Sequence, residues 1–247
     1  MYNNFAKVYD ELMSDVNYTE WTDYLCGLFD KFDRGPNILL DLACGTGGFS
    51  QEFAKKGVSV IGVDISPEML AVAKENSQKQ NLDVLYLCQD ASELDLYGTV
   101  DGAICCLDSL NHITDYNKLC EVFKKVSLFL EKDRLFIFDV NTIFKHKSVL
   151  GDNTFVIETP DTYCVWQNEF EPETDSVYIA LDFFNRTDGE NYQRFSEEFE
   201  ERAYSHNEIK TALDNAGFKI EALFEEMSQN APCDQTERII YIARKIK

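Results

Sequence analysis

Residues 38–48 read Ile-Leu-Leu-Asp-Leu-Ala-Cys-Gly-Thr-Gly-Gly, an apolar run that carries one acid and breaks into a loop of small residues. The run predicts a buried strand at 38–42, and the residues after the loop predict a helix at 48–56. Glycines in such a loop let main-chain N–H groups approach a ligand that a Cβ atom would hold off. The stretch therefore predicts a backbone cradle at the end of the first strand.

Downstream of this loop, the apolar pattern alternates between the period of a strand and that of a helix. The expected strands are 58–63, 83–88, 100–107 and 134–140, and the expected helices are 67–79 and 115–130. Two amphipathic helices are expected between residues 2 and 31. Alternating strands and helices predict an α/β fold with a Rossmann-like, doubly wound and mostly parallel sheet.

The pattern changes again after Gly151. Four alternating segments predict a small antiparallel β insert, at 154–159, 163–170, 176–186 and 192–200. Two last strands, 218–227 and 238–244, are expected to pair as a C-terminal antiparallel hairpin that completes a seven-stranded sheet. We expect residues 1–151 and 201–247 to form the core with an N-terminal helical lid, and 152–200 to cover the substrate. Trp166 and Tyr178 could face either an acceptor or the insert's own core, and the core is the expectation.

The composition argues against several classes of partner. The chain has 44 acidic and 23 basic residues among 247, a formal net charge of -21. Nucleic acids and anionic membranes need clustered Lys and Arg, so we expect neither as a partner. No apolar run approaches the roughly 18 residues of a membrane span, and the first residues lack a signal pattern, so a cytoplasmic protein is expected. The sequence does not indicate the oligomeric state.

The insert and the cysteines each allow a second interpretation. Residues 152–200 hold 13 acids against two arginines, a charge that suits either a solvated outer sheet face, the commoner case, or attraction of a cationic substrate. The eight cysteines include no Cys-x-x-Cys pair, which favours free thiols over a zinc site. Asp108, Asp139 and Asn141 follow neighbouring strands, but their spacing does not reproduce a magnesium site, so no metal is expected.

Two ligands compete for the glycine loop. Ala43-x-Gly45-x-x-Gly48 nearly matches the dinucleotide fingerprint, and Asp64 follows at about the distance of its ribose-binding acid. The alternative pattern, an acid at 41 followed by small residues at 43, 45 and 47, suits an adenosyl group with an amino-acid tail. Because Asp41 opposes a pyrophosphate and suits an ammonium, it favours the second ligand.

With these motifs, the chain resembles the class I S-adenosylmethionine-dependent methyltransferases, in the small-molecule branch with a "domain 25" type core. The resemblance covers most of the chain. It rests on the glycine loop, Val-Ile-Gly-Val-Asp-Ile-Ser-Pro-Glu-Met at 60–69, Cys-Gln-Asp-Ala at 88–91, Cys-Cys-Leu-Asp-Ser-Leu-Asn at 105–111, Ala-Gly-Phe at 216–218 and the closing hairpin. Ala43 departs from the glycine usual in the family, and its single methyl group is expected to be tolerated.

The resemblance implies roles for individual residues. Asp64 would accept hydrogen bonds from both ribose hydroxyls. Ile65 and Met69 would enclose the adenine, while the Asp90 carboxylate and the Ala91 N–H would bind its edge. The methionyl end would lie over the loop and the main chain of Leu107, with Asp41 orienting its ammonium. The loop residues concerned are Ala43, Cys44, Gly45 and Gly47.

The resemblance also implies a lid and a place for the acceptor. Aromatic residues of the amino-terminal helices would close over the cofactor, with Tyr9 and Trp21 as candidates. Packing in the core is an equal alternative for Trp21, so Tyr9 is the better candidate. Candidates for orienting the acceptor are Tyr9, Asp108, Asn111 and His112, the last three just after a strand end. The alternative for Asp108 and Asn111 is to fix this loop, and a structural or exposed role is expected for His112 ahead of catalysis, because a single histidine shows no partner in the sequence. The expected function is methyl transfer to a small-molecule acceptor. An NAD-dependent oxidoreductase and a non-catalytic module that binds S-adenosylmethionine are the alternatives.

Overall fold

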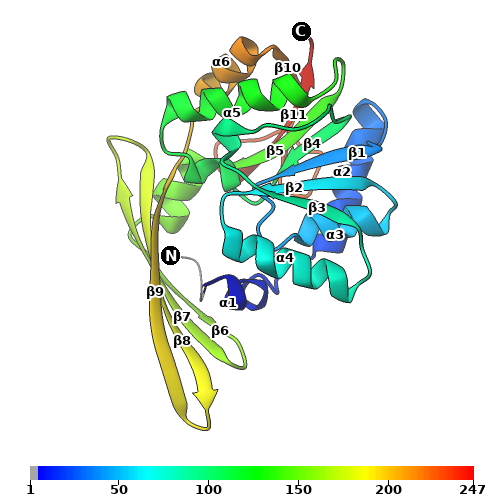
Figure 1. Cartoon of the computed structure of the whole chain (residues 1–247). Helices are drawn as coiled ribbons and strands as arrows, with labels where there is room; N and C mark the ends of the chain where they lie inside the picture. Colours follow the sequence, from blue (N-terminus) through cyan, green and yellow to red (C-terminus); the bar gives the residue numbers. More distant parts are fainter. Residues whose placement is uncertain (1–4) are drawn as a thin grey trace.

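Seven strands form a central sheet in the order β10-β11-β5-β4-β1-β2-β3 in the computed structural model, which describes residues 5–247 (Figure 1). All its ladders are parallel except the two that β11 makes with β10 and β5. The predicted Rossmann-like sheet with a C-terminal antiparallel hairpin is thus confirmed. Its strands are β1 (Ile38–Leu42), β2 (Ser59–Asp64), β3 (Val84–Cys88), β4 (Gly102–Cys105), β5 (Leu135–Asn141), β10 (Phe218–Glu225) and β11 (Arg238–Lys245).

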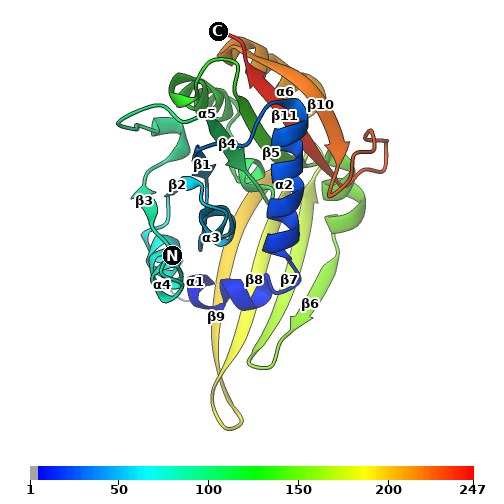
Figure 2. The ribbon, with the colours of Figure 1, turned by 90° about the vertical axis from the view of Figure 1, so that its right-hand side faces the viewer.

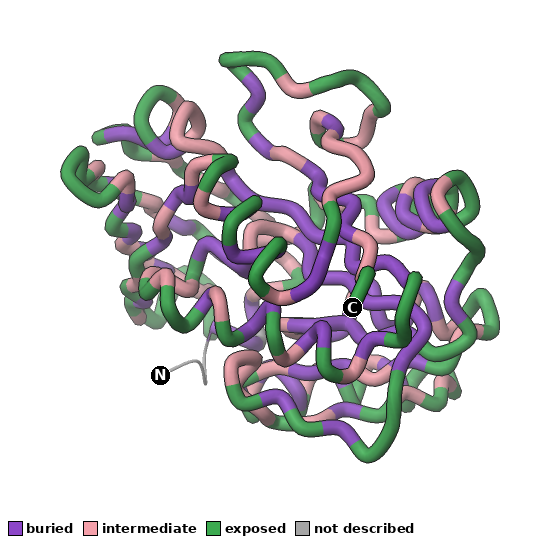
Figure 3. The backbone as a smooth tube through the Cα atoms, turned by 90° about the horizontal axis from the view of Figure 1, so that it is seen from above, coloured by how far each residue is buried: buried purple, intermediate pink, exposed green. Residues whose placement is uncertain are grey.

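Helices cover both faces of this sheet because its central strands are apolar on both sides. Leu39 of β1 packs toward α2 and α3, whereas Leu40 packs toward α5 and α6. The two helical layers lie on opposite sides of the sheet (Figures 1 and 2), and buried residues gather in the strands between them (Figure 3). The helices are α1 (Phe5–Leu12), α2 (Tyr18–Phe32), α3 (Gly48–Lys55), α4 (Pro67–Lys79), α5 (Tyr116–Phe129) and α6 (His206–Ala216).

Local signals place several helix ends. Ser66 accepts a hydrogen bond from the N–H of Met69 and Pro67 occupies the first turn of α4, which starts this helix directly beyond β2. Ser205 and Glu208 form a capping box at α6, which ends at Gly217 with φ 85°. These ends match the sequence prediction. Residues 2–4 of the first predicted helical segment lie outside the described residues.

The insert is a second, antiparallel sheet in the order β6-β7-β8-β9. Gly189, with φ 55°, lies in the turn that joins its two longest strands. Helix α1 lies between this sheet and α4, and its Phe5 and Val8 share an apolar cluster with Met69, Val177 and Phe183. The strands are β6 (Thr154–Glu158), β7 (Thr162–Glu171), β8 (Ser176–Asp188) and β9 (Asn191–Arg202).

Some features differ from the sequence prediction. Tyr178 is exposed and donates a hydrogen bond to Glu198 on the outer face of the insert, so its assignment to the insert's core is wrong. Short helical segments at Ala91–Glu93, Ser109–His112 and Lys145–Leu150, the last a π-helix, were not predicted. Within residues 5–247, no helix combines the length and apolar character needed to cross a membrane.

Candidate active site

A cavity of about 720 Å³ lies at the carboxyl edge of the large sheet and extends to the inner face of the insert. The carboxyl ends and following loops of five parallel strands and helix α1 supply one part of its wall, and apolar side chains of the insert supply another. Such a position is where open α/β sheets bind their ligands. The predicted site residues that line this cavity are Tyr9, Ala43, Gly45, Asp64, Ile65, Met69, Asp90, Ala91, Leu107, Asp108 and His112.

The glycine loop turns three times through the left-handed region, with φ of 56° at Ala43, 54° at Gly45 and 81° at Gly47. A Cβ atom on Gly47 would lie 2.4 Å from the hydroxyl of Tyr86, so only glycine fits there. A Cβ on Gly45 would meet no atom within 4 Å. The space over Gly45 is therefore open to a ligand, as the cradle requires.

Asp64 joins this loop to the loop after β2. Its carboxylate accepts hydrogen bonds from the N–H groups of Gly45 and Ser66, both at 2.8 Å. Burial raises the pKa of Asp64, although these N–H groups oppose the shift. The carboxylate is thus held in place at the cavity wall.

Asp90 is bound from the α5 side. Its carboxylate accepts from the N–H and hydroxyl of Ser92, and it pairs with Lys118 at 2.7 Å. Burial raises the pKa of Asp90, but Lys118 and Ser92 outweigh it, and the net shift is downward. The exposed Ile65 and the buried Met69 lie on the cavity wall between Asp64 and Asp90.

Asp41, at the end of β1, and Cys44 of the loop line a smaller cavity of about 30 Å³ that Tyr9 also lines. The Asp41 carboxylate accepts a hydrogen bond from Ser50 at 2.5 Å. Burial raises the pKa of Asp41 to about 7, although the bond from Ser50 opposes the shift. The small cavity has room for a water molecule, through which Asp41 can act on a ligand above the loop.

The loop after β4 is held by a buried ion-pair cluster. Leu107 and Asp108, with φ of 58° and 52°, donate their N–H groups to the Asp139 carboxylate at 2.7 and 2.8 Å. Arg238 contacts both Asp139, at 2.5 Å, and Asp108, at 2.8 Å. Burial raises the pKa of Asp108, but Arg238, Lys145 and His112 outweigh it and lower that pKa to about 2. The two carboxylates considered for magnesium therefore bind a guanidinium.

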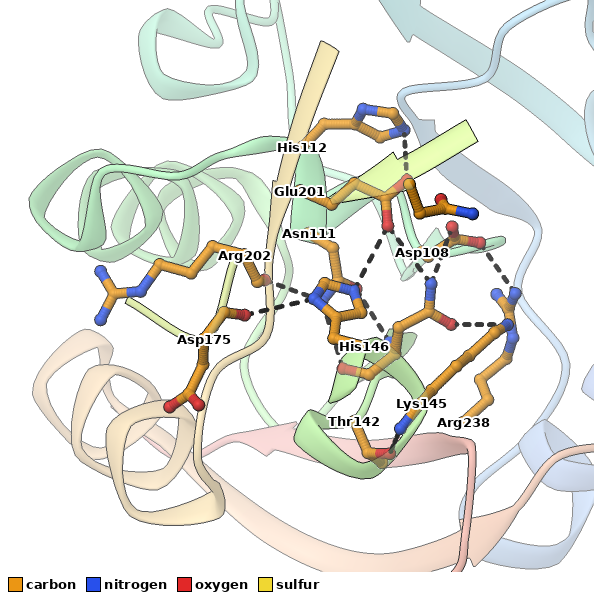
Figure 4. Close-up of polar contacts among 12 residues, drawn as sticks. Asp108, Asn111, His112, Thr142, Lys145, His146, Asp175, Glu201, Arg202 and Arg238 are labelled. Atoms are coloured by element: carbon orange, nitrogen blue, oxygen red, sulfur yellow. Dashed lines mark hydrogen bonds and ion pairs between the residues drawn. The ribbon is translucent and has the colours of Figure 1, made fainter. Parts of the chain in front are cut away.

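Asn111 and His112 have different surroundings. Asn111 is fully buried and its side chain bonds the carbonyls of Asn141 and Arg202, which ties the loop to the insert and leaves no group for an acceptor. His112 lines the cavity, with its Nε2 atom 3.6 Å from the buried carboxylate of Glu201 (Figure 4). Of the two, only His112 meets the cavity.

The two lid candidates, Tyr9 and Trp21, lie in different parts of the structure. Tyr9 lines both cavities, and burial raises the pKa of its phenol, which keeps it neutral. Trp21 lies in the core instead, with its ring centroid 6.1 Å from that of Phe49 and 6.3 Å from that of Tyr24. The expectation that Trp21 closes over the cofactor is corrected, because its helix turns the indole toward α3.

Several cavity residues were missed from the sequence. Arg238 is the first residue of β11 and pairs in register with Asn141 of β5. In the sequence, only the expected pairing of the last two strands could have indicated its position. Glu201 and Lys118 carried no signal, since they reach the site from a strand end and a helix surface. Trp166, for which both positions were considered, packs against the insert's apolar cluster and also lines the cavity, and it donates to Asn168 at 2.7 Å.

The arrangement suits a ligand with a ribose, a planar base and a cationic tail. Asp64 offers carboxylate oxygens beside the open space over Gly45, and Ile65 offers an exposed apolar side chain. The net charge of -21 favours a cationic ligand over a pyrophosphate. The residues present therefore fit S-adenosylmethionine.

Comparisons with known proteins agree. A family model described as a methyltransferase domain matches residues 39–133. A solved S-adenosylmethionine-dependent methyltransferase from Clostridium acetobutylicum ATCC 824 is 37% identical, with TM-score 0.90 over 100% of this chain and 99% of that one. CalS10 of Micromonospora echinaspora, an amino pentose methyltransferase solved with S-adenosylmethionine bound, shares the fold at 18% identity, with TM-score 0.75 over 93% of this chain and 92% of that one.

A full-length relative decides the family. YqeM of Bacillus subtilis (strain 168), which bears the name of a methyltransferase, is 36% identical over 248 residues, covering 100% of this chain and 98% of its own. These matches support neither an NAD-dependent oxidoreductase nor a non-catalytic module. The chain belongs to the class I S-adenosylmethionine-dependent methyltransferases, and S-adenosylmethionine is its methyl donor.

Proposed function

We propose that this methyltransferase acts on a small-molecule acceptor, which binds between the turn Ser109–His112 and the insert. The cavity carries the proposal, because about 720 Å³ lies in the upper part of the roughly 300–1,000 Å³ typical of small-molecule sites. Its insert side is mainly apolar, which suits an acceptor with an apolar body. The insert residues on this wall are Ile157, Cys164, Trp166, Leu181 and Phe199.

The proposal assigns the other part of the cavity to the methyl donor. Asp64 would bind the ribose hydroxyls and Ile65 and Met69 the adenine, whose edge would meet Asp90 and the Ala91 N–H. The open space over Gly45 supports placing the methionyl end there. Ala43, Cys44, Gly47 and Leu107 would shape this seat through their main chain, and Asp41 would act on the ammonium from beneath.

The chain's own part in the reaction is alignment and exclusion of water. When bound, S-adenosylmethionine supplies a methyl group on a sulfonium, which an acceptor would take in line as the thioether leaves. Such a reaction gains most from a fixed geometry and a dry cavity. Helix α1 and the insert would exclude water, and the neutral phenol of Tyr9 would lie near the positive charge.

The proposal excludes nucleic acid as the acceptor and places the protein in the cytoplasm. The net charge of -21 supports the first point, since a phosphate backbone would be repelled. The eight cysteines are free thiols, which supports a reducing compartment.

A fractionated extract tests the acceptor class. The protein is incubated with S-adenosylmethionine and separate small-molecule, protein and nucleic-acid fractions, and S-adenosylhomocysteine is measured by mass spectrometry. We expect product with the small-molecule fraction only. Gly45→Asp is the inactive control, because aspartate tolerates a φ of 54° and its side chain enters the cradle. Product only with protein or nucleic acid would overturn the proposal.

A further inference from the structure

Glu201 lies at the end of β9 with its carboxylate between two histidines. Its side chain is 5% exposed, one oxygen lies 3.6 Å from Nε2 of His112, and the other lies 3.4 Å from Nε2 of His146 (Figure 4). His112 belongs to the turn after β4 and His146 to the π-helix after β5. Three segments far apart in the sequence thus form one His–Glu–His array beside the cavity, which both His112 and Glu201 line.

The bonding of His146 fixes a proton within this array. His146 is fully buried and its Nδ1 atom lies 3.2 Å from the carbonyl oxygen of Asp175. A carbonyl oxygen only accepts, so Nδ1 carries a hydrogen. Among the described residues, Nε2 has no well-aligned hydrogen-bond partner and faces Glu201. Because a bare nitrogen and a carboxylate would repel each other, one proton lies between them, on the imidazolium or on the acid.

The other charges nearby do not neutralise Glu201. Asn141 donates to Glu201 at 3.4 Å and to Asp108 at 3.0 Å, and it accepts from Lys145 at 3.1 Å. Arg238 contacts Asp108 at 2.8 Å. The guanidinium therefore pairs with Asp108, and the two imidazoles are the groups within ion-pair distance of Glu201 in residues 5–247.

His112 is the end of the array that a substrate reaches. Its side chain is 44% exposed and its ring packs on Phe199 of the insert with centroids 4.9 Å apart. With Nε2 facing Glu201, a hydrogen on Nε2 leaves the lone pair of Nδ1 free. A histidine whose second nitrogen is oriented by a carboxylate is a common arrangement for a general base.

We propose that His112 takes the proton the acceptor loses, while Glu201 and His146 act as positioning residues that keep the His112 hydrogen on Nε2. This rests on the proposed function. The acceptor heteroatom forms a bond to the methyl carbon, the carbon–sulfur bond breaks with its electron pair going to sulfur, and the heteroatom proton moves to Nδ1. The acceptor is therefore a protic nucleophile, such as an amine, alcohol, phenol or thiol, and is neither a carboxylate nor a thioether.

Nuclear magnetic resonance of the three histidines, 112, 146 and 206, tests the array without an acceptor. The ¹⁵N signals of the full chain are assigned with His112→Asn and His206→Asn. We expect a protonated Nε2 on His146 and a hydrogen on Nε2 of neutral His112. Glu201→Gln should remove the first and mix the tautomers of the second. Glu200→Gln, the same charge change on the exposed face one residue away, should alter neither.

Two outcomes of this NMR experiment would contradict the His–Glu–His array. A bare, non-bonded Nε2 on His146 in the wild-type protein overturns it, whether or not Glu201→Gln folds. Wild-type histidine signals in a folded Glu201→Gln variant overturn it as well. These spectra do not depend on finding an acceptor, so their failure differs from failure of the extract assay.

Turnover then tests the role of His112. With a protic acceptor from the extract assay, His112→Asn should lower kcat by about 10²- to 10⁴-fold, the usual contribution of a general base, with the Kd of S-adenosylmethionine within twofold of wild type. An unchanged kcat, or an acceptor without a transferable proton, would overturn the proposal.

Discussion

At the residue scale, three residues that line the cavity carry backbone strain. Ala43, Leu107 and Asp108 have positive φ without being glycine, a conformation that costs roughly 1–2 kcal/mol per residue. Asp139 accepts the N–H groups of Leu107 and Asp108, and Arg238 forms ion pairs with both acids. Buried charge thus holds main chain in a strained form where the methyl donor would lie, as is common at functional sites.

The role of Asp64 is testable through affinity. We expect Asp64→Ala to weaken binding of S-adenosylmethionine by roughly 1.5–3 kcal/mol, the scale of hydrogen bonds to a charged group. Part of that loss would come from the loop, because the carboxylate also holds the Gly45 N–H. Calorimetric titration measures it, with Asp83→Ala, an exposed aspartate before β3, as the control. Equal affinities of the folded variant and wild type would remove Asp64 from the site.

The raised pKa of Asp41 predicts that replacing this residue stabilises the folded chain at high pH. Its pKa is about 7 in the folded chain and about 3.9 when unfolded. The folded state binds the extra proton between these values, so the cost of ionising Asp41 grows from about pH 4 to about pH 7 and stays complete above that. We expect Asp41→Asn to raise the unfolding free energy by roughly 1–3 kcal/mol above pH 7 and little near pH 4.

Thermal unfolding at the two pH values measures this difference, and Asp83→Asn is the matched control. The same variant should bind S-adenosylmethionine more weakly, because a neutral amide attracts an ammonium less. A gain in Tm of equal size at both pH values would show that ionisation of Asp41 is not its cause.

At the scale of elements, α1 is fixed to both sides of the cavity. Asp10 accepts hydrogen bonds from Thr46 of the glycine loop, at 2.5 Å, and from Asn76 of α4, at 2.9 Å. Glu11 accepts from Thr159 and Thr162 of the insert. The helix that carries Tyr9 therefore links the glycine loop to the insert.

Cutting the link to the glycine loop should loosen the lid without unfolding the core. We expect Asp10→Ala to speed dissociation of S-adenosylmethionine by about 5- to 10-fold, equivalent to about 1 kcal/mol for the lost hydrogen bonds, and to increase hydrogen exchange in α1. Stopped-flow dissociation and exchange mass spectrometry measure these changes, with Asp15→Ala in the exposed turn beyond α1 as control. Unchanged dissociation would show that α1 does not retain the donor.

The elements were predictable where one pattern determined them. The Ser66–Pro67 helix start and the capping box at Ser205 gave ends that the structure reproduces. The π-helix Lys145–Leu150 has no periodic signal of its own, since its form follows from packing between β5 and the insert. Tyr178 was misplaced because alternation along β8 identifies two faces but does not say which one is inward.

Site residues divide in the same way. Asp64, Asp90 and the glycine loop follow strand ends of a parallel sheet, whose common edge is a consequence of the fold. Arg238, Glu201 and His146 reach the site through the antiparallel hairpin, the last strand of the insert and the π-helix. No local sequence pattern predicts these long-range contacts. The carboxylate of Glu201 beside His112 could therefore be identified only from the three-dimensional structure.

At the scale of the whole molecule, the insert has two unlike faces. Side chains such as Cys164, Leu181 and Phe199 lie on the inner face toward the cavity, while Glu169 and Glu198 are exposed on the other. Most acidic residues of the insert are thus exposed to solvent. This favours a solvated outer sheet face over attraction of a cationic substrate as the account of its charge.

This division predicts that donor and acceptor binding respond to different parts of the chain. Trp166 lies on the insert's side of the cavity and is held by Asn168. We expect Trp166→Ala to enlarge the acceptor region and raise the KM for the acceptor at least tenfold, because a buried aromatic contact contributes about 1.5–3 kcal/mol. The Kd of S-adenosylmethionine should stay within twofold of wild type.

Tyr178→Ala, on the outer face of β8, should change neither constant. Calorimetry for the donor and steady-state kinetics with the acceptor from the extract assay separate the two effects. A Trp166 variant that loses donor affinity while keeping its acceptor KM would show that the insert serves the donor, and the proposed division of the cavity would then be reversed.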